Sequence, residues 1–250
     1  MSDQLSLQRL AWVLRNDVMR SYRSTLVISG TAALVALAVS LSVAYDGEVG
    51  QGPLFYRAFF IAALFAWGTL ATSEAFSDLH GRGSNASFLL LPASALEKTL
   101  SRLLIYTVGL IVYLLAFTVA LSWVLEGINT LWIGERRELF SPFDSLAWSL
   151  VPHFVVAQSL FFLGAAWFRK VHFIKTVGAA IALAAGLCAI AAGLAWLVGP
   201  IACVNAECYE FPLFDWLTDA APVAYFYLLP PFCWFVAWLR VTETQVSHGI

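Results

Sequence analysis

The sequence predicts an all-α membrane protein with six transmembrane helices in a single transmembrane domain, residues 1–250. Hydrophobic residues make up 60% of the chain and charged residues only 12%, whereas a soluble domain carries roughly 25% charged residues. Six apolar stretches are long enough to cross a bilayer, which takes roughly 20 residues. Because backbone polar groups must be satisfied internally in hydrocarbon, these spans are expected to be helices.

The six spans are found by searching for apolar stretches between charges. We expect them at residues 26–45, 54–72, 103–125, 146–168, 176–198 and 221–239. The sixth contains Pro222, Pro230 and Pro231. Because proline removes a backbone donor and clashes with the preceding turn, this span is expected to be kinked or broken.

The segment before the first span is amphipathic. Leu7, Leu10, Leu14 and Val18 recur at helical spacing, and arginines occupy the other side. This pattern predicts an N-terminal interfacial helix over residues 4–23, although a basic flank to the first span would have the same composition. The polar segment also indicates that the first span is not a cleaved signal peptide.

The distribution of basic residues predicts the orientation. With six alternating spans, only Arg57, Arg136 and Arg137 lie on the side opposite the termini. The other eleven of the fourteen basic residues share the side of the termini: Arg9, Arg15, Arg20, Arg23, Arg82, Lys98, Arg102, Arg169, Lys170, Lys175 and Arg240. The positive-inside rule therefore predicts a multi-pass protein of the plasma (inner) membrane with both termini cytoplasmic.

The connection between spans two and three is the longest on the cytoplasmic side. Gly81 and Gly83 interrupt it, Ser84 is placed to cap a short helix through Leu91, and Pro92 ends that helix. The apolar run at residues 88–91 is too short to span a bilayer and is more apolar than a solvent-exposed cytoplasmic loop without a partner. It predicts contact with a partner or with the membrane surface.

A second helix is predicted to begin directly after Pro92. Ser94 and Glu97 have the spacing of a capping box, in which the Ser94 hydroxyl accepts from the Glu97 amide and the Glu97 carboxylate accepts from the Ser94 amide. The connection therefore reads as helix, break and helix, with the second helix leading into the third span.

The motifs of this connection are His80-Gly81-Arg82-Gly83-Ser84, then Phe88-Leu89-Leu90-Leu91-Pro92-Ala93-Ser94, then Leu96-Glu97-Lys98. They resemble the corresponding loop of ABC transporter permeases, the transmembrane subunits of the type-2 export family. The six spans, the cytoplasmic termini and the N-terminal interfacial helix also resemble that family.

The resemblance implies that residues 84–91 form a cytoplasmic coupling helix that seats in a groove of a separate ATP-binding cassette subunit. The docking residues it implies are Arg82, Ser84, Phe88, Leu89, Leu91 and Glu97. It also implies pairing with a second permease copy or a homologous permease. An alternative is that the short helix only caps the cytoplasmic end of the bundle.

No phosphate-binding Gly-x-x-x-x-Gly-Lys-Ser/Thr motif occurs in the chain. Any ATP and Mg are therefore expected on the partner subunit, with no cofactor, metal or catalytic residue on this chain. The net charge of −2 gives no indication of nucleic-acid binding. His153 and Gln158 are the one polar grouping near a span interior, and a hydrogen-bonding contact between helices explains them without catalysis.

Cys203 and Cys208 lie in the last outer connection, where an oxidising exterior permits a disulfide. Sequence spacing leaves this bridge an open possibility, because it does not give the Cα separation. The transported substrate is also left open. The alternatives to an exporter subunit are a passive membrane partner, such as an immunity or assembly factor, and an intramembrane enzyme.

Overall fold

The computed structural model describes residues 6–45, 52–80, 93–134, 138–168, 171–204, 207–208 and 219–247. Within these residues, six helices are long and apolar enough to cross a membrane. Apart from one pair of two-residue strands, all the described elements are helical. The prediction of an α-helical, multi-pass membrane protein is confirmed at this level.

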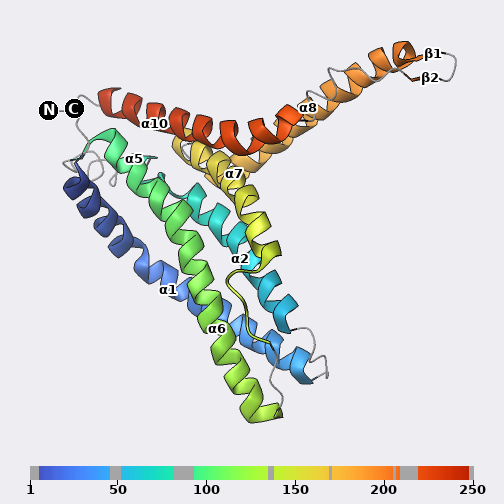
Figure 1. Ribbon diagram of the computed structural model, residues 1–250. Helices are drawn as coiled ribbons and strands as arrows, with labels where there is room; N and C mark the ends of the chain where they lie inside the picture. Colours follow the sequence, from blue (N-terminus) through green and yellow to red (C-terminus); the bar gives the residue numbers. More distant parts are fainter. Residues whose placement is uncertain are drawn as a thin grey trace.

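The elements follow one another as shown in Figure 1. Their bounds are α1 (Leu7–Tyr45), α2 (Gly52–Ser73), α3 (Ser77–His80), α5 (Ala95–Leu104), η2 (Ile105–Gly109), α6 (Leu110–Ile133), α7 (Ser145–Trp167), α8 (His172–Ala202), β1 (Cys203–Val204), β2 (Glu207–Cys208), η3 (Ala224–Leu228) and α10 (Leu229–Ser247).

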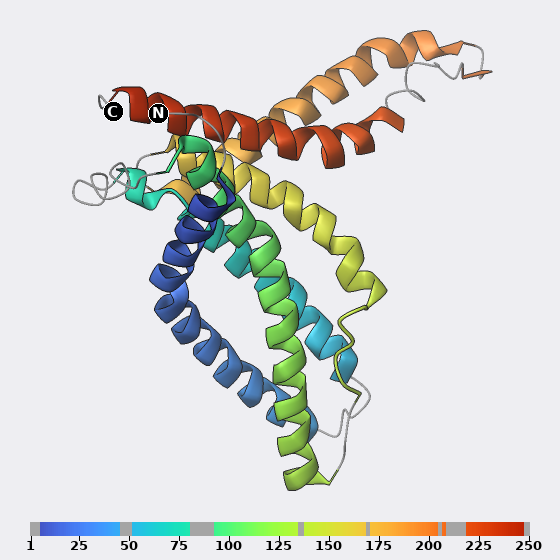
Figure 2. The ribbon, with the colours of Figure 1, turned by 60° about the vertical axis from the view of Figure 1, so that its left-hand side comes forward.

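Figures 1 and 2 show α1, α2 and the α5–α6 helix running side by side. We call the end of the molecule where α1 and α5 begin the proximal end, and the opposite end, where α1 and α6 finish, the distal end. α10 finishes near the proximal end, while α8 extends away from the other helices.

The first helix differs from its predicted form. α1 is a single helix of 39 residues, about 58 Å long, and it joins residues 7–23 to the first span without a break. No proline or glycine separates the two segments, so no residue there ends the helix. Figure 2 shows that α1 curves along its length. Its placement at the membrane interface stays a prediction.

The third span is longer than predicted at both ends. α5 and α6 are joined by a π-helical turn, η2, and the helix continues to Ile133. It ends at Gly134, whose φ of 80° is left-handed and whose amide donates to the carbonyl of Thr130 at 3.2 Å. Glu126, which the predicted span left in the outer connection, therefore lies inside a helix.

The sixth span is not broken at its prolines. A π-helical turn, η3, directly precedes Pro230 and Pro231, and the helix continues through them as α10. The amide of Leu229 donates to the carbonyl of Ala224, five residues back. The π-helical turn shifts the backbone hydrogen-bond pairing by one residue just before Pro230 and Pro231, which have no backbone N–H to donate.

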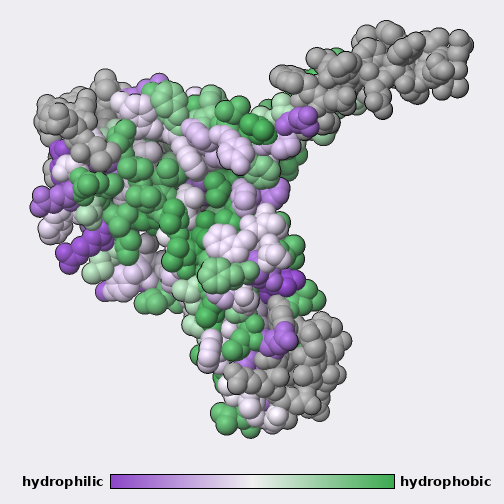
Figure 3. All heavy atoms as spheres, in the orientation of Figure 1, coloured by the Kyte–Doolittle hydropathy of each residue, from purple (hydrophilic) through white to green (hydrophobic). Residues whose placement is uncertain are grey.

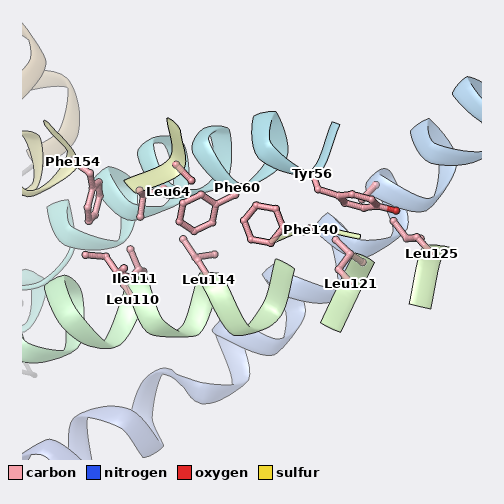
Figure 4. Packing of buried hydrophobic residues seen from close by; sticks show 12 residues of the cluster. Tyr56, Phe60, Leu64, Leu110, Ile111, Leu114, Leu121, Leu125, Phe140 and Phe154 are labelled. Atoms are coloured by element: carbon pink, nitrogen blue, oxygen red, sulfur yellow. The ribbon is translucent and has the colours of Figure 1, made fainter. Parts of the chain in front are cut away.

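The main apolar core lies between α2 and α6. Figure 4 shows Phe60 and Leu64 of α2 directed toward Leu114 and its neighbours on α6, with Tyr56 of α2 near Leu125 of α6. Phe140, from the segment before α7, packs on Phe60 with ring centroids 5.8 Å apart. These contacts join α2 to α6 along one apolar interface.

Two glycines allow close approach of α7 to its neighbours. A Cβ added at Gly68 of α2 would overlap the ring of Phe154 on α7, and one added at Gly164 of α7 would overlap Thr176 of α8. Beyond this contact, the described side chains of α8 from residue 181 to residue 194 are all exposed. α8 is therefore attached to the bundle mainly near its start.

Candidate functional site

The candidate site is a set of charged and polar side chains at the proximal end, on both sides of residues 81–92. We call it the proximal cluster: Arg9, Asp17, Arg20, Asp78, Glu97, Ser101 and Arg102. Its members come from the first half of α1, from α3 and from α5. The contact between Arg9 and Glu97 joins residues 88 positions apart in the sequence.

The capping box at the start of α5 is confirmed. The Ser94 hydroxyl accepts from the Glu97 amide at 3.2 Å, and Glu97 Oε2 accepts from the Ser94 amide at 2.9 Å. The other carboxylate oxygen of Glu97 accepts from the amide of Ser6 at 2.9 Å and lies 3.4 Å from Nε of Arg9. Glu97 is fully buried. One carboxylate thus ties the start of α5 to the start of α1.

Asp78 makes the matching connection on the other side of residues 81–92. It lies in α3, one tight turn after α2 ends. Its Oδ2 accepts from Arg20 of α1 at 2.7 Å and from Arg102 of α5 at 3.3 Å. Asp78 therefore joins α3 to both of the helices that Glu97 joins.

Arg102 is the most connected cation of the cluster. Besides its bond to Asp78, its guanidinium donates to the carbonyl of Ala75 and lies 5.2 Å from the ring centroid of Phe76. The residue is 6% exposed. A buried charge is tolerated only when it is paired and hydrogen-bonded, and these contacts meet that condition by fixing α5 against the turn after α2.

A third polar contact joins α5 to α1, between the contacts that Glu97 and Asp78 make with α1. The Ser101 hydroxyl donates to Oδ2 of Asp17 at 3.0 Å, so α5 is bonded to α1 on two successive turns. α3 and α5, which flank residues 81–92, are therefore cross-linked to each other and to α1 by polar contacts.

The predicted docking residues are placed as follows. Arg82, Ser84, Phe88, Leu89 and Leu91 lie outside the residues that the structure describes. Glu97 is described, and its carboxylate oxygens accept bonds from within the bundle. In this structure Glu97 holds α5 to α1, and its part in docking stays a prediction.

A second polar group lies at the distal end and was missed from the sequence. The hydroxyl of Tyr56 on α2 donates to Oε1 of Glu126 on α6 at 2.6 Å, and Nδ2 of Asn129 donates to Ser40 of α1 at 3.1 Å. Glu126 is 1% exposed. The spacing of Glu126 and Asn129, three residues apart on one helix face, was the available signal.

An ion pair also holds α2 to α7 at the distal end. Arg57 donates to Asp144, which caps α7 by accepting from the Ala147 amide at 3.0 Å. That amide, together with the Arg57 guanidinium, holds the pKa of the Asp144 carboxyl below its ordinary value, against the effect of burial. Arg57 is therefore a structural residue at the end of its span.

The polar pair near the interior of the fourth span has weak contacts. His153 Nδ1 lies 3.5 Å from the hydroxyl of Tyr225, and Trp234 donates to Gln158 at 3.4 Å. A shallow apolar hollow of about 430 Å³ lies nearby, with Val151 and Phe226 in its lining. Among the described residues, no three His, Cys, Asp or Glu side chains are grouped to hold a metal ion.

The two cysteines of the last connection lie opposite one another in the backbone. Cys203 of β1 pairs with Cys208 of β2 in antiparallel register. Such opposed residues have Cα atoms about 4.5–5.5 Å apart, within the roughly 4.4–6.8 Å that a disulfide requires. The backbone therefore supplies the separation that the sequence left open, and the disulfide stays a prediction.

We expect Cys203 and Cys208 to be bridged when the protein is purified from membranes without reductant. Alkylation before reduction should then label Cys188 and, once the protein is unfolded, Cys233, which are free thiols. Peptide mass spectrometry should show the other two labelled only after reduction. Equal labelling of all four cysteines in the unreduced, unfolded protein would contradict the bridge.

Comparisons with known proteins do not extend these observations: no family model, no curated protein and no solved structure matches the chain. The likeness to type-2 export permeases rests on residues 80–98 and on the pattern of spans.

Proposed function

We propose that this chain is the transmembrane subunit of an ATP-driven exporter, which forms the translocation path and couples to separate ATP-binding cassette subunits. The observation that supports the proposal most directly is the proximal cluster. Its polar contacts cross-link the helices on both sides of residues 81–92, the segment whose motif resembles the docking loop of export permeases. A docking segment that passes force to the transmembrane helices requires the helices on both sides of it to be firmly connected.

The contacts define a route along which movement would travel. A push on residues 81–92 would reach α3 through Asp78 and α5 through Glu97, and both carboxylates also bind α1. α5 continues through η2 and α6 to the distal end, where Glu126 is bonded to α2. Packed helices of this kind move as units rather than deforming continuously.

ATP and Mg belong to the partner subunit in this proposal, because the chain has no phosphate-binding loop. A second permease copy, or a homologous permease, would complete the path. α8 supports this part of the proposal, since Gly178, Gly186 and Gly193 have open space beside them. Ala182 lies four residues from both Gly178 and Gly186, and small residues at this four-residue spacing let membrane helices approach closely.

Docking is tested by placing charges on the predicted anchors. In membranes of the native host, pull-down of the tagged chain should recover a protein with a phosphate-binding loop and ATPase activity. The double variant Phe88→Asp with Leu89→Asp should weaken this association roughly 30-fold for each anchor and about 1,000-fold in total, since each buried anchor contributes about 2 kcal/mol. Titration of the recovered ATPase against the tagged chain measures the change.

The matched control carries the same two charges at the distal end. Leu131 and Phe143 are 85% and 83% exposed, so Leu131→Asp with Phe143→Asp should leave the association unchanged. Recovery of no such ATPase by the wild-type chain, or equal recovery by the Phe88 and Leu89 variant, would contradict the exporter proposal and favour a passive membrane partner.

A further inference from the structure

The arginines of the first half of α1 divide into two pairs. Arg9 and Arg20 turn toward the bundle and contact Glu97 and Asp78. Arg15 and Arg23 instead lie over aromatic rings of their own helix. The guanidinium carbon of Arg15 is 5.7 Å from the ring centroid of Trp12.

Arg23 makes the same kind of contact about two helical turns further along α1. Its guanidinium carbon lies 5.8 Å from the ring centroid of Tyr22, and its Nε donates to the Tyr22 hydroxyl at 3.0 Å. Among the described residues, no carboxylate forms an ion pair with Arg15 or Arg23. Both cations therefore keep donors available for a ligand.

The two cation and ring pairs share one face of α1. At about 100° per residue, Trp12, Arg15, Met19, Tyr22 and Arg23 fall within roughly a third of the helix circumference. This face is exposed, with Trp12 and Met19 at 62% and 59%. It lies opposite the side that contacts α5. Figure 3 shows hydrophilic side chains projecting at the edge where α1 begins.

We propose that this face of α1 binds the headgroups of anionic phospholipids in the leaflet nearest the proximal end. α1 runs without a break into the charge-free stretch 26–45, which places Arg23 about 5 Å and Arg15 about 16 Å from the start of that stretch along the helix axis. Arginine beside Trp or Tyr is the pairing expected at headgroup level, where the ring sits at the interface and the guanidinium meets phosphate.

Anionic lipid is favoured over a protein partner by this continuity with the first span. A residue this close to the bilayer meets lipid phosphate at high local concentration, and each basic residue near an anionic membrane surface is attracted to it. The same helix holds Asp78 and Glu97 on its other side. Bound lipid would therefore also steady the proximal cluster, whether or not the chain is an exporter subunit.

The test uses the purified chain alone, titrated with dioleoyl phosphatidylglycerol or dioleoyl phosphatidylcholine and followed by native mass spectrometry. We expect Arg15→Gln with Arg23→Gln to weaken phosphatidylglycerol binding roughly 25-fold, about fivefold for each arginine. Phosphatidylcholine binding should not change. An unchanged thermal midpoint in phosphatidylcholine would show that the variant is folded.

Two further variants make the result specific. Lys175→Gln with Arg240→Gln removes two other cations that lie over rings, those of Phe168 and Trp167, and should change phosphatidylglycerol binding less than threefold. Arg15→Lys with Arg23→Lys keeps the charge and should retain most of the binding. Unchanged binding in the Arg15 and Arg23 glutamine variant, or equal loss in the Lys175 and Arg240 control, would overturn the proposal. No ATPase is involved, so either outcome leaves the exporter proposal to its own test.

Discussion

Replacing Arg102 by methionine is expected to lower the free energy of unfolding by about 3 kcal/mol. Methionine keeps much of the apolar volume of the side chain but removes the donors to Asp78 and to the carbonyl of Ala75. Breaking a buried charge pair leaves the partner uncompensated, which typically costs about 3–5 kcal/mol. Unfolding in mixed micelles with increasing SDS, followed by tryptophan fluorescence, measures the change.

Arg20 is the matched control, because it binds the same oxygen of Asp78. Its side chain is 56% exposed against 7% for Arg102. Exposed ion pairs contribute about 0–1 kcal/mol, so Arg20→Met should cost about 1 kcal/mol or less. If both variants cost the same, burial of the cluster does not determine its contribution to stability.

The second large effect is expected at the contact between α7 and α8. Gly164→Ala adds a single methyl group, which would overlap the side chain of Thr176 at Oγ1, Cβ and Cγ2. Relief requires the helices to separate, because the overlap reaches Thr176 Cβ rather than a flexible side-chain end. We expect a loss of about 1–3 kcal/mol, the usual cost of overpacking, measured by the same SDS unfolding.

Gly127→Ala supplies the same chemical change where no atom lies within 4 Å of the new methyl group. It should be neutral or should stabilise α6 by about 1 kcal/mol, because alanine is the better helix former. Adding Thr176→Ala to Gly164→Ala should recover much of the loss, since the overlap is then removed. Equal effects of the two glycine variants would show that the helix approach is not as close as described.

The sequence by itself determined the class of protein and the position of its spans. Hydropathy depends only on local composition, and a bilayer of fixed thickness converts it into the number and approximate position of spans, although not into the full length of the helices that carry them. The capping box was equally local, because Ser94 and Glu97 satisfy one another across three residues. These features need no knowledge of which helices are neighbours.

Tertiary structure alone decided how the charges are used. Helical periodicity separates Arg9 and Arg20 from Arg15 and Arg23 on α1, but it does not give the carboxylates on α5 and α3 that the first two bind. The burial of Glu126 against Tyr56 likewise depends on a partner 70 residues away. A buried charge is stabilised by whatever polar group the fold brings to it, and the pattern of one helix does not contain that partner.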